Sequence, residues 1–100
     1  MPVKLLMTWD IKVGRESEYS EFVVNEFIPR LNRLGLGEIE FWYTRYGDCQ
    51  QIQASGMMPS LEQIQNVLKS REWQELEQRL EDYVTDYSHK IIRATTGFQF

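Results

Sequence analysis

A single histidine, His89, occurs in this sequence of 100 residues. It is the one side chain expected to titrate near neutral pH without perturbation, so it could act as a general base or as an axial haem ligand. Alternatively, it could lie in the last turn of a helix, where the helix dipole favours its positive charge. Sequence spacing positions no carboxylate or second ligand beside it, so the sequence favours the structural role.

Two charged residues, Asp10 and Arg93, are the other candidates for chemistry. Asp10 could act as a base, and Arg93 could bind a carboxylate or enolate through its forked donors. The two belong to strands that are expected to be neighbours, and the sequence favours a salt bridge between them, across strands or across a dimer. The same sheet face carries five residues that could bind a ligand or pack in a wet interface, namely Thr8, Trp42, Tyr46, Gln51 and Gln53.

The composition excludes several classes of function. Lys and Arg number 11 against 15 Asp and Glu, and this net charge of −4 disfavours binding to a nucleic-acid backbone. One cysteine, Cys49, and one histidine allow neither an intramolecular disulfide nor a multi-histidine metal centre. No signal peptide and no membrane-spanning run is recognisable. We therefore expect a cytoplasmic protein with no metal, no cofactor, no nucleic-acid partner and no membrane partner.

Hydrophobic periodicity predicts the elements that must position these residues. Residues 3–13 and 38–46 alternate between apolar and polar side chains, as half-buried strands do. Between them, Pro29 should kink or split a helix because it has no N–H to donate, and Gly35 and Gly37 should end that helix. The apolar stripe of this helix recurs at spacings of three and four and consists of Tyr19, Phe22, Val23, Phe27, Leu31 and Leu34.

The second half of the chain begins with a hairpin, whose turn is predicted at Gly47-Asp48. Ser60 and Gln63 form the S-x-x-Q pattern of a capping box, and Ser70 is a second candidate N-cap. Residues 89–100 alternate again and predict the last strand. The helix before this strand is predicted from a regular apolar stripe, which consists of Trp73, Leu76, Leu80, Tyr83, Val84 and Tyr87.

The predicted order is β-α-β-β-α-α-β in one domain of residues 1–100. Two crossovers around a hairpin fit a ferredoxin-like α+β fold, in which helices cover one face of a four-stranded antiparallel sheet. The uncovered face would carry Trp42, Leu6 and Ile91 among polar side chains. Burying those polar groups without partners costs about 1–3 kcal/mol each. We therefore expect a homodimer that pairs two uncovered faces around a polar cavity or a wet interface.

Two short segments support this expectation: Glu21-Phe22-Val23-Val24-Asn25-Glu26-Phe27-Ile28-Pro29 and Ser70-Arg71-Glu72-Trp73. With the element order and the small size, they resemble the dimeric α+β barrel superfamily, and within it the NIPSNAP-like and antibiotic-biosynthesis-monooxygenase-like proteins. The resemblance implies that two sheets pair into a barrel. Some members oxidise aromatic polyketides without a cofactor, and others degrade haem.

The catalytic residues of that group match this chain only in part. Members that use an Asn/Trp/His set have the asparagine on the first strand, where this sequence has Met7, Thr8 and Trp9. Trp73 could match the helical tryptophan of the set, although its place in a regular apolar stripe indicates a core residue.

Two functions from different classes remain open. The first is a homodimeric, cofactor-independent monooxygenase-like or isomerase-like protein that binds a small, partly aromatic molecule between sheet and helices. In it Asp10 or His89 would act as the base, and Arg93, Tyr46 or Trp42 would position the substrate. The second is a non-catalytic ligand-binding or dimerisation module, in which the same side chains only hold two subunits together. A haem-degrading enzyme is a third possibility.

Overall fold

The computed structural model describes residues 2–46 and 49–93 of the chain. The elements follow one another as β1 (Val3–Ile11), α1 (Glu16–Phe22), η1 (Val23–Phe27), α2 (Ile28–Arg33), β2 (Gly37–Tyr46), β3 (Cys49–Met58), α3 (Leu61–Lys69), α4 (Arg71–Glu81) and β4 (Val84–Arg93). The predicted turn at Gly47-Asp48 and the part of the last predicted strand beyond residue 93 lie outside the described residues.

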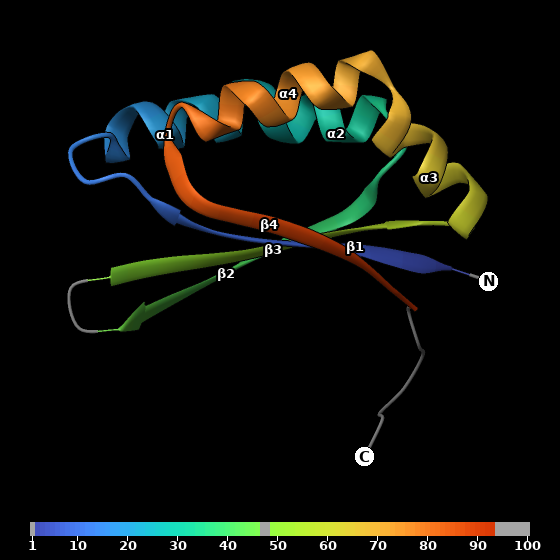
Figure 1. Cartoon of the computed structure of the whole chain (residues 1–100), viewed down its shortest axis with the longest axis horizontal. Helices are drawn as coiled ribbons and strands as arrows, with labels where there is room; N and C mark the ends of the chain where they lie inside the picture. The colour runs from blue at the N-terminus through green and yellow to red at the C-terminus, as the bar shows by residue number, and fades with distance from the viewer. Residues whose placement is uncertain (1, 47–48, 94–100) are drawn as a thin grey trace.

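The four strands form one antiparallel sheet in the order β2-β3-β1-β4. All the described helices lie on one side of this sheet, and no described element covers its other side, which we call the uncovered face (Figure 1). The fold is therefore the predicted ferredoxin-like α+β arrangement, and the first and last strands are neighbours as predicted. No helix within the described residues combines the length and the apolar character needed to cross a bilayer.

The first helical segment is split at the predicted place. Pro29 lies in the first turn of α2, and the five residues before that helix form a π-helical turn, η1. The N–H of Ile28 donates to the carbonyl of Val23, five residues earlier. A proline inside an α-helix disrupts the regular ladder, and a widened turn before it accommodates the loss.

Gly35 ends this segment, as predicted. It has a φ of +106°, its N–H donates to the carbonyl of Asn32, and the next N–H, of Leu36, donates to the carbonyl of Leu31. This pair of bonds is the Schellman arrangement, which needs a left-handed residue and therefore favours glycine.

Both predicted serine caps of the second helical pair are confirmed. Ser60 Oγ accepts a hydrogen bond from the N–H of Gln63 at 3.2 Å and begins α3. Ser70 Oγ accepts from the N–H of Trp73 at 3.2 Å and begins α4. The core interpretation of Trp73 is also confirmed, because only 2% of the residue is exposed.

The boundary between α4 and β4 differs from the prediction. The sequence predicts helix through Tyr87 and strand from His89, whereas α4 ends at Glu81 and β4 begins at Val84. The cause is a β-bulge: between Thr8 and Asp10 the pairing with β4 moves from Ser88 to Thr85, so β4 holds one extra residue. Because of the bulge, Val84 and Tyr87 lie on the same side of the sheet although they are three residues apart. A spacing of three is also typical of the apolar stripe of a helix, so the sequence pattern predicted helix here.

The core lies between the helices and the side of the sheet that they cover. Leu5, Met7 and Trp9 of β1 are fully buried there, whereas the alternate residues of β1 are only half-buried. Ala54 and Ile52 of β3 pair with Met7 and Trp9 and are buried on the same side. The predicted division of the two sheet faces is thus confirmed for the first three strands.

Candidate functional site

The uncovered face carries a polar row that crosses all four strands. Ser88 of β4 pairs with Thr8 of β1, Thr8 with Gln53 of β3, and Gln53 with Trp42 of β2. The Thr8 and Ser88 hydroxyls are hydrogen-bonded at 2.9 Å, and Trp42 remains 45% exposed. A pocket of about 270 Å³ lies over this row and is lined by Leu6, Thr8, Gln53, Ser88, His89 and Lys90. The sequence therefore correctly placed Thr8, Trp42 and Gln53 together on one face.

The adjacent row on the same face holds two more of the predicted residues. Asp10 pairs with Gln51 of β3 on one side and with Thr85 of β4 on the other. Desolvation, a side-chain hydrogen bond with Asp86 and the charge of Asp86 all raise the pKa of Asp10. Tyr46 occupies the last position of β2, and its side chain lies outside the described residues. These residues are at the end of the sheet farthest from Arg93.

The predicted cross-strand salt bridge between Asp10 and Arg93 is wrong. Arg93 pairs with Val3, whereas Asp10 pairs with Thr85, so the two residues lie seven positions apart along β1. At about 3.3 Å per residue, that separation is roughly 23 Å. Arg93 also shares the helix-covered side with its partner Val3, not the uncovered side. The two sides of β4 are therefore the reverse of those predicted.

His89 is likewise on the helix-covered side, in the middle of β4 and not at a helix end. It pairs with the buried Met7, and its imidazole meets the edge of the Trp73 ring at 6.1 Å between centroids. Its Nδ1 lies 3.2 Å from a carboxylate oxygen of Glu77 and 3.3 Å from the hydroxyl of Tyr87. The imidazole is one-third exposed (33%) and is therefore accessible from the edge of the sheet.

Two elements hold this His89 cluster, which we define as Trp73, Glu77, Tyr87 and His89. Trp73 and Glu77 are four residues apart on α4 and therefore share one face of that helix. Burial, a hydrogen bond with Glu77 and the charge of that carboxylate raise the pKa of Tyr87 far above its usual range. Tyr87 therefore remains a neutral phenol.

The cluster places a carboxylate beside Nδ1 of a partly exposed imidazole. A carboxylate beside Nδ1 favours the tautomer that carries its proton there, which leaves the lone pair on Nε2. No side-chain hydrogen bond to Nε2 is made within the described part of the chain. Glu77 was not predicted as a candidate residue, because its place beside His89 depends on where β4 begins.

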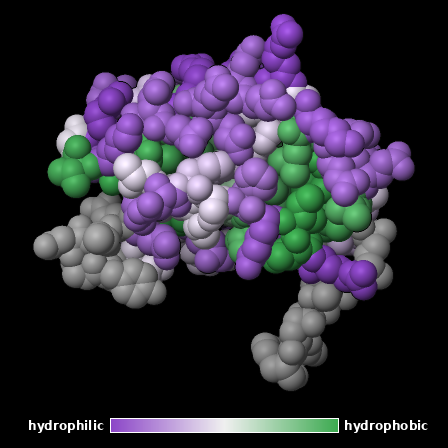
Figure 2. All heavy atoms as spheres, viewed as in Figure 1, coloured by the Kyte–Doolittle hydropathy of each residue, from purple (hydrophilic) through white to green (hydrophobic). Residues whose placement is uncertain are grey.

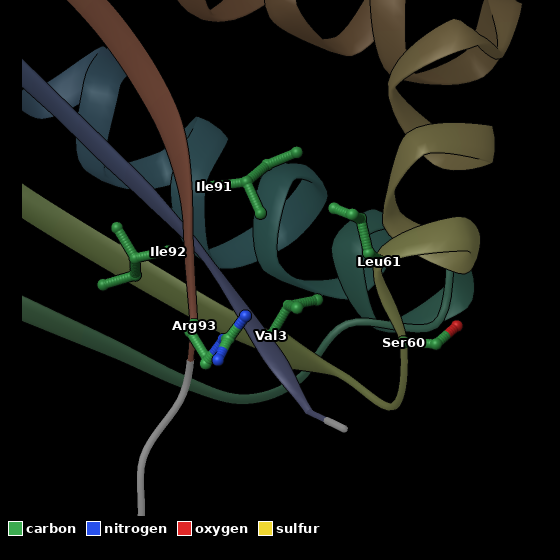
Figure 3. Close-up of a pocket in the computed structure, with 6 residues that line it drawn as sticks. All are labelled: Val3, Ser60, Leu61, Ile91, Ile92 and Arg93. Carbon is green, nitrogen blue, oxygen red and sulfur yellow. The ribbon is translucent and has the colours of Figure 1, made fainter.

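Arg93 lines a different pocket, of about 490 Å³, where α3 begins and β4 ends. In Figure 3, Leu61 of α3 and Ile91 of β4 face each other across this α3–β4 pocket, and the Arg93 side chain lies beside Val3. Figure 2 shows hydrophobic surface at this end of the molecule, below α3. The remaining lining residues are Ser60 and Ile92.

In the described part of the chain, no group of three or more His, Cys, Asp or Glu side chains is arranged to hold a metal ion. The two candidate sites on the helix-covered side are the His89 cluster and the α3–β4 pocket.

No protein-family model matches the sequence, and no curated protein matches it significantly. Solved structures match it along almost its whole length. SnoaB, a cofactor-independent oxygenase from Streptomyces nogalater, has a TM-score of 0.77 at 14% identity, covering 96% of this chain and 95% of its own. A NIPSNAP family protein from Agrobacterium tumefaciens has a TM-score of 0.67 at 23% identity, covering 95% of this chain and 87% of its own.

An antibiotic biosynthesis monooxygenase-like protein from Nitrosomonas europaea has a TM-score of 0.70 at 6% identity, covering 95% of this chain and 91% of its own. These three proteins belong to the dimeric α+β barrel superfamily, and the present chain has their ferredoxin-like fold. The predicted resemblance is therefore confirmed at the level of the fold.

Proposed function

We propose that the protein is a homodimer that binds a small, partly aromatic molecule and oxidises it without a cofactor, with His89 as the proton acceptor. One observation carries this proposal: the imidazole of His89 is partly exposed, and its Nδ1 lies 3.2 Å from Glu77. The likeness to SnoaB, a cofactor-independent oxygenase, supports the same class of reaction. Asp10, the other base considered from sequence, lies on the opposite side of the sheet from this cluster.

The reaction begins with the loss of a proton from an activated carbon of the substrate to Nε2 of His89. Glu77 stabilises the imidazolium that forms. The substrate carbanion gives one electron to O₂, and the two radicals combine to form a peroxide anion. This anion takes the proton back from the His89 imidazolium, which gives a hydroperoxide and regenerates the base. Loss of water from the hydroperoxide then leaves a carbonyl group. For an anthrone, the balance is one anthrone and one O₂ giving one anthraquinone and one water.

The composition of the uncovered face supports the homodimer. Trp42 is 45% exposed on it, and the half-buried Leu6 and Ile92 lie on the same face. A second copy covers the indole and provides hydrogen-bond partners for the polar row, as homodimer interfaces do. Sedimentation at micromolar concentration should therefore show a particle of twice 12.0 kDa. Particles of a single chain only would contradict the dimer.

Dithranol, an anthrone with an acidic methylene group, tests the chemistry. The wild-type protein should consume O₂ and form the quinone from dithranol faster than buffer alone does. His89→Gln should remove this acceleration, since a positioned base contributes about a hundredfold or more to the rate. Lys69→Gln is the matched control, because Lys69 lies at the exposed end of α3, outside the His89 cluster and the uncovered face. It should leave the rate unchanged.

The alternative function is a non-catalytic ligand-binding or dimerisation module. A wild-type protein that forms the dimer but leaves the oxidation of dithranol at the buffer rate would favour this alternative and contradict the oxygenase proposal. Equal rates for wild type and His89→Gln would contradict the role of the histidine.

A further inference from the structure

We infer that the α3–β4 pocket binds an organic acid with an aromatic or otherwise apolar body, and that Arg93 binds its anionic group. This inference rests on the proposed function for the reaction and adds the chemical class of the substrate. The pocket volume of about 490 Å³ falls within the range of about 300–1,000 Å³ that is usual for small-molecule sites.

The walls of the pocket are apolar. Val3 is buried at its base and Ile91 is half-buried at its side. Leu61, the first residue of α3, is 48% exposed and faces Ile91 across the opening (Figure 3). A ligand that covers Leu61 and Ile91 removes apolar surface from water, which favours binding. The body of the ligand is therefore apolar.

The two polar residues that line the pocket, Ser60 and Arg93, differ in what their side chains can bind. The Ser60 hydroxyl is occupied by the α3 cap, because it accepts from the N–H of Gln63 at 3.2 Å. Its side chain also points away from the pocket (Figure 3). Among the described residues, Arg93 is the only charged one that lines the pocket, and it forms no ion pair with any of them. An exposed guanidinium with five free donors matches a carboxylate or sulfonate. In a chain of net charge −4, this local positive charge selects for an anion.

The position of the pocket relative to the His89 cluster limits the length of the substrate. His89, Ile91 and Arg93 alternate along β4 and lie on its helix-covered side, with Ile91 between the other two. At about 3.3 Å per residue, the backbone of Arg93 is roughly 13 Å from that of His89. A substrate held at Arg93 by its acid group must be elongated, of two or three fused or linked rings, to present a carbon to His89.

Calorimetry with two probes of the same ring, naphthoate and naphthalenemethanol, tests the inference. Naphthoate should bind the wild-type protein, and Arg93→Gln should weaken its binding by about tenfold or more, since charge-assisted bidentate contacts are strong. Naphthalenemethanol should bind weakly to both. Leu61→Gln should weaken the binding of both probes, because it replaces an apolar wall. Arg33→Gln, at the exposed end of α2 and outside the pocket, should leave both affinities unchanged.

Equal naphthoate affinities for wild type and Arg93→Gln, or equal affinities of the wild type for the two probes, would overturn the inference. Naphthoate has no acidic methylene group and is not oxidised, so its binding is independent of the reaction at His89. The two proposals can therefore fail separately. If His89→Gln loses dithranol oxidation but Arg93→Gln binds naphthoate as tightly as the wild type does, the ligand class is rejected and the proposed function is kept.

Discussion

The buried pair of Trp9 and Tyr19 allows a prediction whose size follows from the structure. The indole Nε1–H of Trp9 donates to the hydroxyl of Tyr19 at 3.0 Å. Trp9 is fully buried and Tyr19 is 6% exposed. Tyr19→Phe removes the acceptor and keeps the ring, which meets the edge of the Trp9 ring at 6.4 Å between centroids. The substitution therefore leaves an indole N–H without a partner in the core.

A buried donor without a partner costs about 1–3 kcal/mol, and we expect Tyr19→Phe to lower the free energy of unfolding by about 2 kcal/mol. This is a large part of the roughly 5–15 kcal/mol that stabilises a domain of this size. With a urea m-value of about 2 kcal/mol/M, the unfolding midpoint should fall by about 1 M.

Urea unfolding followed by tryptophan fluorescence measures this change, at one protein concentration because association shifts the midpoint. Tyr83→Phe is the matched control: the Tyr83 ring is half-buried against Phe22, and its hydroxyl makes no side-chain hydrogen bond within the described residues. Its midpoint should stay close to that of the wild type. A loss below about 0.5 kcal/mol for Tyr19→Phe, within the usual range of neutral substitutions, would refute the reasoning about the unpaired indole.

The same pair predicts a loss of stability at alkaline pH. Burial raises the pKa of Tyr19 to about 12, against a smaller opposing effect of the Trp9 hydrogen bond. An unfolded tyrosine has a pKa of about 10. Because the folded state holds this proton more tightly, the stabilisation is complete below about pH 10 and is lost as the pH rises towards 12, by at most about 3 kcal/mol. Tyr87, whose pKa is raised in the same direction, adds to the loss, so Tyr19→Phe should reduce the alkaline loss without abolishing it.

Two further substitutions test the packing and the dimer. Gly56→Ala should lower the free energy of unfolding in urea by about 1–3 kcal/mol, because overpacking a core is costly. The added Cβ would lie 2.6 Å from Leu36 Cδ2. An unchanged unfolding midpoint would contradict this close packing. Trp42→Asp should weaken the dimer roughly tenfold or more in sedimentation equilibrium, as loss of an aromatic anchor does. Tyr43→Asp, on the opposite side of the same strand, should weaken it far less, and equal effects would argue against pairing through the uncovered face.

The residue patterns of the chain determine the fold to a large extent. Alternation in β1, the serines at positions 60 and 70, and Gly35 after the first helical segment each encode a local structure that needs few distant contacts. Because these signals are local, they predicted the element order, the caps and the helix end. The order of elements then leaves few topologies, since crossovers between strands are right-handed. The ferredoxin-like sheet and its uncovered face follow from these constraints.

The chemistry of the candidate site depends on the tertiary structure. Side chains alternate along a strand, so one extra residue in β4 reverses which of its residues face the helices. The bulge before Ser88 thus moves His89 and Arg93 from the uncovered face to the covered one, and no local sequence signal marks it. Glu77 meets His89 only because α4 packs over β4, and the α3–β4 pocket joins Val3, Leu61 and Ile91 from three distant segments. The sequence by itself determined the layers, and the pairing of β4 decided which side chains meet between them.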